Sequence, residues 1–466
     1  MNKGRTLSGF ALACVAIATL IDQLSGGFPI VYHVANAAML VYVALEIGPS
    51  PMMTKVMIAF AIVLAALLWP HMTSPWAVVE EGIAFGAFLS TFFVALGFVR
   101  AASDKSKRIK LSGRHLLTQP PSRRYLALTV GSNLFGLILS IGVLNLLGSM
   151  VKKSNTLASV GGSVQTLKTR ERRSLMAIQR GFSMVPAWSP LSISVPIVLL
   201  AIPSLSWEQL VPAALAAVIL LLLLGWLDDR ITFRGRVAPP YQSDGPPLNW
   251  TVHLPFLLLI GAIFGSSVMM EKALDTRMVV GMMTCAPIAA LIWMLMQSYP
   301  LGRKLGCAWM QKRLITQMTE TFPRYRIEII VMFSAGFYGV LIKETLPPTL
   351  IADAIAYFDI SVSWLPLLVF LMIIVMANLT LHPMLSVIIL STAMPTPESL
   401  GISPISMGLA YLSGWGVGVS TSPYTICNLI VAQVASKTAH QVAYQWNGRY
   451  ILSCTLLGGI GLYLLA

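Results

Sequence analysis

The chain has 466 residues, of which 56% are hydrophobic and only 11% are charged, and its mean hydropathy is +0.76. Soluble domains carry about 25% charged residues, so this composition excludes an ordinary soluble enzyme. A net charge of +14 could indicate a nucleic-acid partner, but the basic residues follow the positive-inside pattern of a membrane protein, and we expect no nucleic acid.

Four apolar blocks of near membrane-spanning length open the chain, and no clear signal-peptide cleavage site follows the first. They lie at 8–24, 29–46, 56–70 and 79–99. A strongly basic loop follows the fourth block. Because basic loops stay in the cytoplasm, this loop and the N-terminus are predicted to be cytoplasmic. The basic residues of the loop are Arg100, Lys105, Lys107, Arg108, Lys110, Arg114, Arg123 and Arg124.

The next apolar block, 126–150, is also followed by a basic stretch, which a simple crossing would place outside the cell. A re-entrant hairpin at 125–150, entered from the cytoplasm, removes this conflict. Non-helical backbone at membrane depth is tolerated where protein or a wet cavity surrounds it. The sequence Gly131-Ser132-Asn133 is the candidate turn.

The remaining blocks cross the membrane alternately outward and inward, and this order keeps the basic loops in the cytoplasm. Spans are predicted near 181–203, 207–227, 250–270, 278–297, 327–345, 403–435 and 450–466. A second hairpin at 363–394, interrupted at Asn378 to Pro383, enters from the opposite side. All of the 32 Lys and Arg residues except Lys272, Arg277 and Lys343 then face the cytoplasm.

The predicted fold is an all-α polytopic membrane protein. It has about 11 transmembrane helices plus two opposed re-entrant hairpins in an inverted repeat, with the N-terminus inside and the C-terminus outside. We expect 1–100 to be mainly scaffold, 101–227 to form a first repeat core, 228–345 to be linker and scaffold, and 346–466 to form a second core.

Two of the predicted spans are interrupted at corresponding places, about half the chain length apart. The first break contains Ser189-Pro190, and the second runs from Gly414 to Ser422-Pro423. Paired interrupted spans in two halves are the best sequence indication of a transporter's binding site. A broken helix exposes N–H groups that suit anions and carbonyl groups that suit sodium.

The order of spans and opposed hairpins resembles the ion transporter superfamily, particularly the divalent anion:sodium symporters and the arsenite-permease and citrate-carrier branches. Those symporters carry Ser-Asn-Thr at both hairpin tips, compared with Ser132-Asn133-Leu134 and Asn378-Leu379-Thr380 here. Ser420 to Tyr424 is similar to the second broken helix of the arsenite and citrate branches. The resemblance implies an elevator mechanism and a homodimer.

The candidate substrate- and ion-binding residues are polar residues of the hairpins and breaks: Ser132, Asn133, Ser189, Asn378, Thr380, Ser420, Thr421 and Ser422. His382 is a candidate for proton coupling, because histidine titrates near neutral pH. The asparagines could instead cap or bridge helices, the hydroxyls could bond their own helices, and His382 could be structural. We predict no catalytic residue and no metal site beyond sodium at these same positions.

These features predict a secondary active transporter in the bacterial inner membrane that moves a small organic carboxylate or oxyanion, coupled to sodium or protons. Its partners would be the anionic solute and the lipid bilayer, with no cofactor except a possible sodium ion. Two alternatives stay open: a membrane subunit that needs a solute-binding partner, and a membrane-embedded polysaccharide polymerase or ligase. No Walker-type phosphate loop occurs, which argues against ATP drive within this chain.

Overall fold

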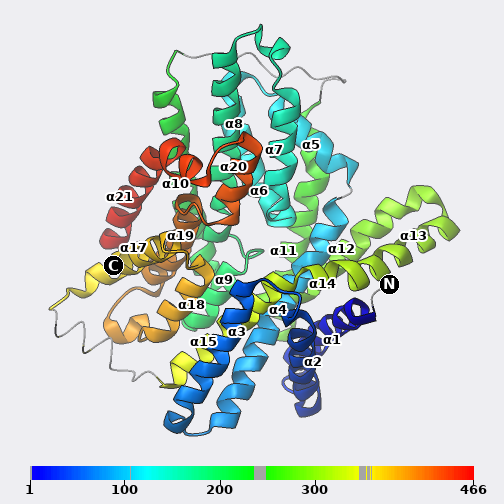
Figure 1. The fold of residues 1–466 in the computed structure, drawn as a ribbon, viewed down its shortest axis with the longest axis vertical. Coiled ribbons are helices and arrows are strands. Elements are labelled where there is room, and N and C mark those ends of the chain that lie inside the picture. Colours follow the sequence, from blue (N-terminus) through cyan, green and yellow to red (C-terminus); the bar gives the residue numbers. More distant parts are fainter. Residues whose placement is uncertain (1–2, 105, 236–247, 346–352, 354–356, 358) are drawn as a thin grey trace. The chain divides into compact units, whose positions relative to one another are not determined.

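The computed structural model describes residues 3–104, 106–235, 248–345, 353, 357 and 359–466. In these residues every regular element is a helix (Figure 1). The chain divides into two compact units: unit 1 comprises Met1–Ala102 and Leu258–Leu350, and unit 2 comprises Ser103–Leu257 and Ile351–Ala466. The scaffold and core roles stay predictions, and the predicted start of the second core at residue 346 lies outside the described residues.

Unit 1 is built from long apolar helices that approach one another at glycine. α4 packs on α15 where Gly82 and Gly86 face Phe337 and Phe333. A Cβ atom at Gly86 would lie 2.7 Å from Cδ2 of Phe333, so a larger residue would separate the helices. The helices are α1 (Lys3–Ser25), α2 (Pro29–Ile47), α3 (Met52–Leu68), α4 (Pro75–Asp104), most of α11 (Leu254–Leu274), α12 (Met278–Ser298), α13 (Arg303–Thr316), α14 (Phe322–Arg324) and α15 (Arg326–Thr345).

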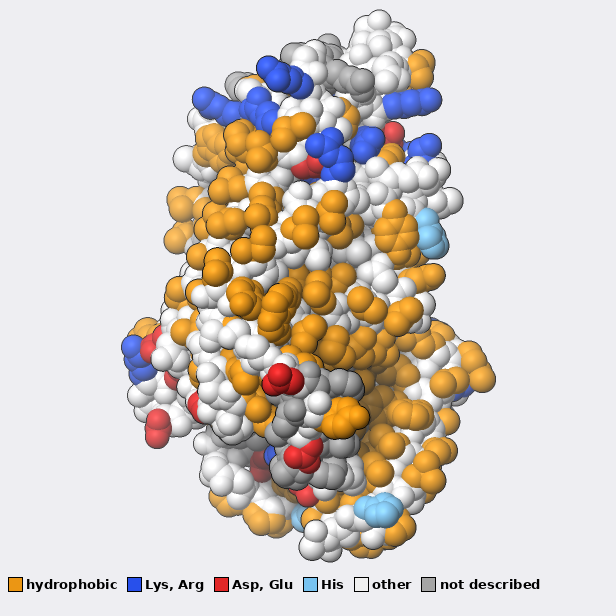
Figure 2. All heavy atoms as spheres, turned by 90° about the vertical axis from the view of Figure 1, so that its left-hand side faces the viewer, with side chains coloured by type: hydrophobic (Ala, Val, Ile, Leu, Met, Phe, Trp, Pro, Cys, Tyr) orange, Lys and Arg blue, Asp and Glu red, His pale blue; other side chains and the backbone are white. Residues whose placement is uncertain are grey.

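The chain is a multi-pass membrane protein. Eight helices of the described residues are long and apolar enough to cross a membrane, or up to nine if the bent pair Arg303–Arg324 and Arg326–Thr345 forms one span. On the face in Figure 2, much of the visible surface is hydrophobic, and several Lys and Arg side chains lie together near the top of the view. The predicted number of about 11 spans and their orientation stay predictions.

Unit 2 contains two helical hairpins and two interrupted helices. Its helices are α5 (Lys107–Leu117), α6 (Pro121–Leu139), α7 (Gly142–Ser154), α8 (Val164–Ser183), α9 (Ser194–Ala201), α10 (Trp207–Thr232), α17 (Leu365–Asn378), α18 (Pro383–Ala393), α19 (Pro404–Thr421), α20 (Ile426–Ala435) and α21 (Gly448–Leu465). A π-helical segment, Gln441–Trp446, precedes α21.

The first hairpin, α6 and α7, does not turn where we predicted. The sequence Gly131-Ser132-Asn133 lies inside α6, and the chain turns at Ser140, whose φ is +49°. Gly131 instead allows close packing, because a Cβ atom there would lie 2.2 Å from Cδ1 of Leu116 on α5. The predicted turn is therefore wrong, since the glycine serves helix contact.

The first interrupted helix breaks between α8 and α9. α8 ends at Ser183, and regular α-helix resumes only at Ser194. Pro186 and Pro190 lie in between and lack the N–H that would continue the helical hydrogen bonds. The predicted break is thus present, and it follows a helix that starts well before residue 181.

The second interrupted helix breaks later than predicted. α19 continues through Gly414 and Gly418 to Thr421, and α20 begins at Ile426. The break falls at Pro423, which has no N–H to donate. Gly414 and Gly418 serve packing on α17, since Cβ atoms there would lie 3.0 Å from Ile373 and 3.3 Å from Ala377. The glycine-rich part of the predicted break is therefore helical.

Candidate functional site

Both interrupted helices have their breaks inside unit 2. The α8 side of the first break contacts α19, whose end forms one side of the second break. Gln179 in the last turns of α8 contacts Ser420 near the end of α19. In the first break, Ala187 lies against α19, where a Cβ atom at Gly416 would be only 2.9 Å away. The last carbonyl groups of a helix lack helical partners and carry partial negative charge. Two such ends meet here in a buried region.

At the first break, one carboxamide binds the end of α8. Asn133 donates from Nδ2 to the Gly181 carbonyl oxygen at 2.9 Å, and its Oδ1 accepts from the Trp188 indole N–H at 3.1 Å. An indole N–H only donates, so Trp188 fixes which end of the amide faces the helix. Asn133 is therefore placed at the break, although it lies within a helix.

The serine hydroxyls at the first break bond to their own segments. Ser132 Oγ donates to the Thr129 carbonyl oxygen at 3.1 Å, and Ser189 Oγ accepts from the Leu191 N–H at 3.1 Å. Both serines are fully buried. Ser189 thus stabilises the turn that leads toward α9, and the ligand roles of both serines stay predictions.

At the second break, the hydroxyls also have local partners. Thr421 Oγ1 donates to the Val417 carbonyl oxygen at 2.6 Å, and Ser422 Oγ accepts from the Tyr424 N–H at 3.2 Å. Ser420 differs, since its hydroxyl oxygen accepts from outside its own helix. The second break is therefore joined to other elements through Ser420.

Three buried carboxamides converge on the carbonyl oxygen of Ser420. Gln179 Nε2 lies 3.2 Å away, Asn428 Nδ2 lies 3.0 Å away, and Asn447 Nδ2 lies 3.4 Å away. All three side chains belong to residues with no exposed surface. The negative end of α19 is thus covered by amide donors from α8, α20 and the start of α21.

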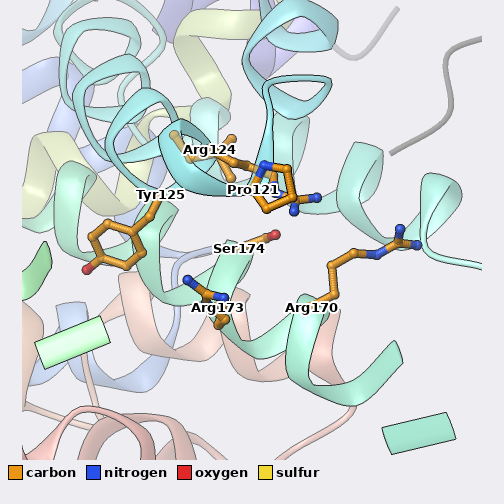
Figure 3. A pocket seen from close by; sticks show the side chains of 7 residues that line it. Pro121, Arg124, Tyr125, Arg170, Arg173 and Ser174 are labelled. Carbon is orange, nitrogen blue, oxygen red and sulfur yellow. The ribbon is translucent and has the colours of Figure 1, made fainter. Parts of the chain in front are cut away.

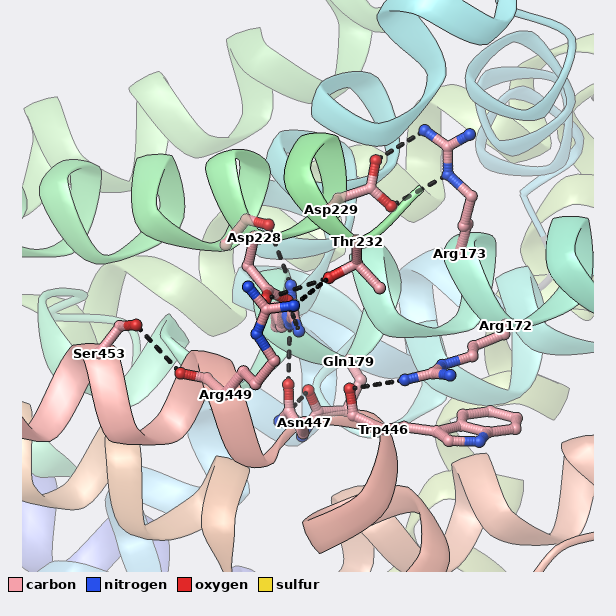
Figure 4. Close-up of polar contacts among 12 residues, drawn as sticks. Arg172, Arg173, Gln179, Asp228, Asp229, Thr232, Trp446, Asn447, Arg449 and Ser453 are labelled. Atoms are coloured by element: carbon pink, nitrogen blue, oxygen red, sulfur yellow. Dashed lines mark hydrogen bonds and ion pairs between the residues drawn. The ribbon is translucent and has the colours of Figure 1, made fainter. Parts of the chain in front are cut away.

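An arginine–aspartate cluster lies behind these amides (Figure 4). Arg180 donates from Nε to Asn447 Oδ1 and from Nη2 to Asp228 Oδ2, both at 2.8 Å. Arg173 binds both carboxylate oxygens of Asp229, at 3.0 and 2.6 Å. Buried charges require such partners, so the cluster joins α8 firmly to α10.

At the tip of the second hairpin, Asn378 and Thr380 lie nearer the surface. Asn378 Oδ1 accepts from the Tyr444 hydroxyl at 2.9 Å, and its Nδ2 donates to the Ile374 carbonyl oxygen at 2.8 Å. Thr380 is exposed and has a φ of +74°. The tip is therefore a tight turn held to the π-helical segment by the Tyr444 hydroxyl.

His382 acts as the N-cap of α18. Its Nδ1 accepts from the Met384 N–H at 3.2 Å, and its ring lies edge-on to Trp415 with 6.3 Å between ring centroids. This N-cap role is the structural alternative named for His382 in the sequence analysis. The proton-coupling role stays a prediction.

The predicted residues thus fall in three places. Ser132, Asn133 and Ser189 lie at the first break, Ser420, Thr421 and Ser422 at the second, and Asn378, Thr380 and His382 at the second hairpin. Gln179, Arg180, Asn428, Asn447 and Tyr444 were not predicted. Asn428 could have been found, because it interrupts the apolar run 426–432, where polar residues are functional suspects.

A separate cavity lies between the start of α6 and α8 (Figure 3), with an empty volume of about 290 Å³, part of it open to solvent. The Arg170 guanidinium points away from Ser174 and donates to Asn155 Oδ1 at 2.7 Å, while Arg173 binds Asp229. Because these cations already have protein partners, we place the candidate site at the breaks. The cavity is lined by Pro121, Arg124, Tyr125, Leu128, Arg170, Arg173 and Ser174.

The described residues contain no group of three or more His, Cys, Asp or Glu side chains that could hold a metal ion. The first break carries the hydroxyl groups of Ser183, Ser189 and Ser194, each of which is hydrogen-bonded within its own segment.

No protein-family model and no curated protein matches the chain. Among solved structures, it is similar to the crystal structure of the YdaH transporter of Alcanivorax borkumensis, described as having an unusual topology. The TM-score is 0.59 at 14% identity, and the alignment covers 89% of this chain and 98% of that chain. The chain therefore shares the fold of a solved transporter.

Proposed function

We propose that the protein is a secondary active transporter that moves a small anion across a bacterial inner membrane without changing it chemically. The observation that carries this proposal is the pair of interrupted helices, whose ends meet in the interior of unit 2. Interrupted helices at corresponding places supply solute and ion sites in transporters. The shared fold with the YdaH transporter supports the same conclusion.

The solute is proposed to be an organic carboxylate or a small oxyanion. The starts of α9 and α20 present N–H groups at the breaks, and these attract negative charge. The hairpin turns and the breaks themselves, 140–141, 379–382, 184–193 and 422–425, contain no Lys or Arg. Helix dipoles, amides and hydroxyls would therefore hold the anion.

Coupling is proposed to use sodium or protons. Sodium would bind at the first break, with carbonyl oxygens at the end of α8 and the hydroxyls of Ser183, Ser189 and Ser194 as its ligands. Protons would use His382. In the elevator mechanism implied by the resemblance to the ion transporter superfamily, the hairpins and interrupted helices move together, and the protein acts as a homodimer.

The proposal is tested with full-length protein, first by thermal stabilisation with dicarboxylates, tricarboxylates and small oxyanions. Each anion is tried in sodium and in choline at two pH values, because a ligand of the native state raises its stability. Anions that stabilise the protein are then tested for uptake into proteoliposomes. Stabilisation and uptake of one anion class is the expected result, whereas failure of every anion in both assays would overturn the proposed solute class.

Asn133→Ala is expected to reduce uptake about tenfold, which corresponds to the ~1.4 kcal/mol scale of one buried hydrogen bond. The variant removes the amide that binds the Gly181 carbonyl oxygen. Asn145→Ala on the exposed face of α7 serves as the matched control. Unchanged uptake in both Asn133→Ala and Asn378→Ala would show that the site is elsewhere.

A further inference from the structure

Hydrogen bonds fix which end of each carboxamide around Ser420 donates and which end accepts. Arg180 donates to Asn447 Oδ1, and a guanidinium has no acceptor, so the NH2 of Asn447 must face away from it. That NH2 donates to Gln179 Oε1 at 3.2 Å and to Ser420 Oγ at 2.9 Å. The orientation of Asn447 therefore sets the orientation of Gln179.

The same order of donors and acceptors continues from Gln179 to the end of α19. Gln179 Nε2 donates to Asn428 Oδ1 at 3.1 Å. This leaves the NH2 of Asn428 to donate to the carbonyl oxygens of Ser420 and Ser422, at 3.0 and 2.9 Å. Starting from the Arg180 cation, each amide dipole thus points its positive end toward the negative end of the helix.

The first break lacks this arrangement. The end of α8 receives one carboxamide, Asn133, and a neutral indole orients it. Arg180 itself is 2% exposed and has Asp228 as a counter-ion, which Arg449 also approaches at 3.7 Å. The two helix ends are therefore alike in backbone but differ in what balances them electrostatically.

We propose that Arg180 is a positioning residue that takes the place of a coupling cation at the second break. Through Asn447, Gln179 and Asn428 it holds amide donors on the carbonyl oxygens that a cation would otherwise bind. A coupling cation would then bind at the first break alone. The inference rests on the proposed transport function but is tested without a transported solute.

The first test converts one amide donor into a cation ligand. In Asn428→Asp, a carboxylate faces the carbonyl oxygens of Ser420 and Ser422, and oxygen ligands suit hard cations. Purified full-length protein is heated in sodium chloride and in choline chloride at equal ionic strength. Sodium should raise the thermal midpoint of Asn428→Asp by about 3 °C or more beyond its effect on wild type. Asn145→Asp, a charge-matched control, should gain nothing.

The second test removes the proposed internal cation. Arg180→Ala should lower the thermal midpoint, and millimolar guanidinium or sodium should restore part of the loss while choline should not. Arg172→Ala, on the same helix but half-buried and bound to carbonyl oxygens of 445 and 446, should show no such rescue. A purely structural role for Arg180 predicts the loss without rescue by sodium.

The third measurement compares wild type with Ser189→Ala at the first break, so the inference is still tested if a variant at the second break does not fold. Ser189 is a candidate ion ligand that lies away from the Ser420 amides, and sodium-dependent stabilisation of wild type should disappear in Ser189→Ala. Sodium stabilisation that survives Ser189→Ala, or a folded Asn428→Asp without a sodium response, would overturn the inference. If no anion binds but these sodium responses occur, the proposed function fails while the role of Arg180 stands.

Discussion

Gly181→Ala is expected to destabilise the protein by about 1–3 kcal/mol, the usual cost of overpacking, and to abolish uptake. A Cβ atom at this position would lie 2.1 Å from Ser132 Oγ and 2.1 Å from the Thr129 carbonyl oxygen. Because one of these atoms is backbone, α6 must move away from α8. That movement would also break the bond between Asn133 and the Gly181 carbonyl oxygen.

The measurement is the thermal midpoint of purified protein together with uptake in proteoliposomes. Gly265→Ala on α11 is the control, since a Cβ atom there meets nothing within 4 Å. It should lower neither quantity, because alanine favours a helix more than glycine does. A Gly181→Ala protein as stable as wild type would mean that α6 and α8 pack less closely than described.

Gln179→Leu is expected to destabilise the protein as much as Gly181→Ala or more. Gln179 is fully buried and makes four hydrogen bonds, to the Ser420 carbonyl oxygen, Ser420 Oγ, Asn428 Oδ1 and Asn447 Nδ2. Each buried polar group left without a partner costs about 1–3 kcal/mol. Leucine of similar volume supplies no replacement, so the thermal midpoint should fall markedly.

The control for this variant lies on the same helix. Gln165→Leu changes an exposed side chain in the first turn of α8 and should shift the midpoint little. Equal midpoints for Gln179→Leu and Gln165→Leu would contradict the amide network described around Ser420.

The helices and the approximate positions of both breaks could be predicted from the sequence, because the length of an apolar block and the position of a proline determine structure without distant contacts. Pro186 and Pro423 each remove a hydrogen-bond donor wherever the chain goes, so the interruptions fall near them. Glycine was misread for the opposite reason. Gly131 and Gly416 permit either a turn or a close helix contact, and the choice depends on the neighbours Leu116 and Ala187, which lie far away in sequence or on another element.

The site was only partly predictable. Asn133 was chosen for a hairpin tip and does lie at the first break, but its partners Gly181 and Trp188 could not be inferred from spacing. Gln179 and Arg180 looked like part of a basic loop, since their burial depends on Asn447, more than 250 residues later. Long-range hydrogen bonds of this kind leave no local pattern.

The hydrogen bond between Tyr444 and Asn378 is expected to be open in a sizeable fraction of molecules. Tyr444 is exposed and Asn378 is half-buried, so losing this bond costs at most about 1 kcal/mol, and at least roughly one molecule in six would have it open at equilibrium. The bond between Asn133 and Gly181 is buried, so a much smaller fraction of molecules would have it open. The two hairpins should therefore differ in the share of molecules whose contact is open, even in protein without solute.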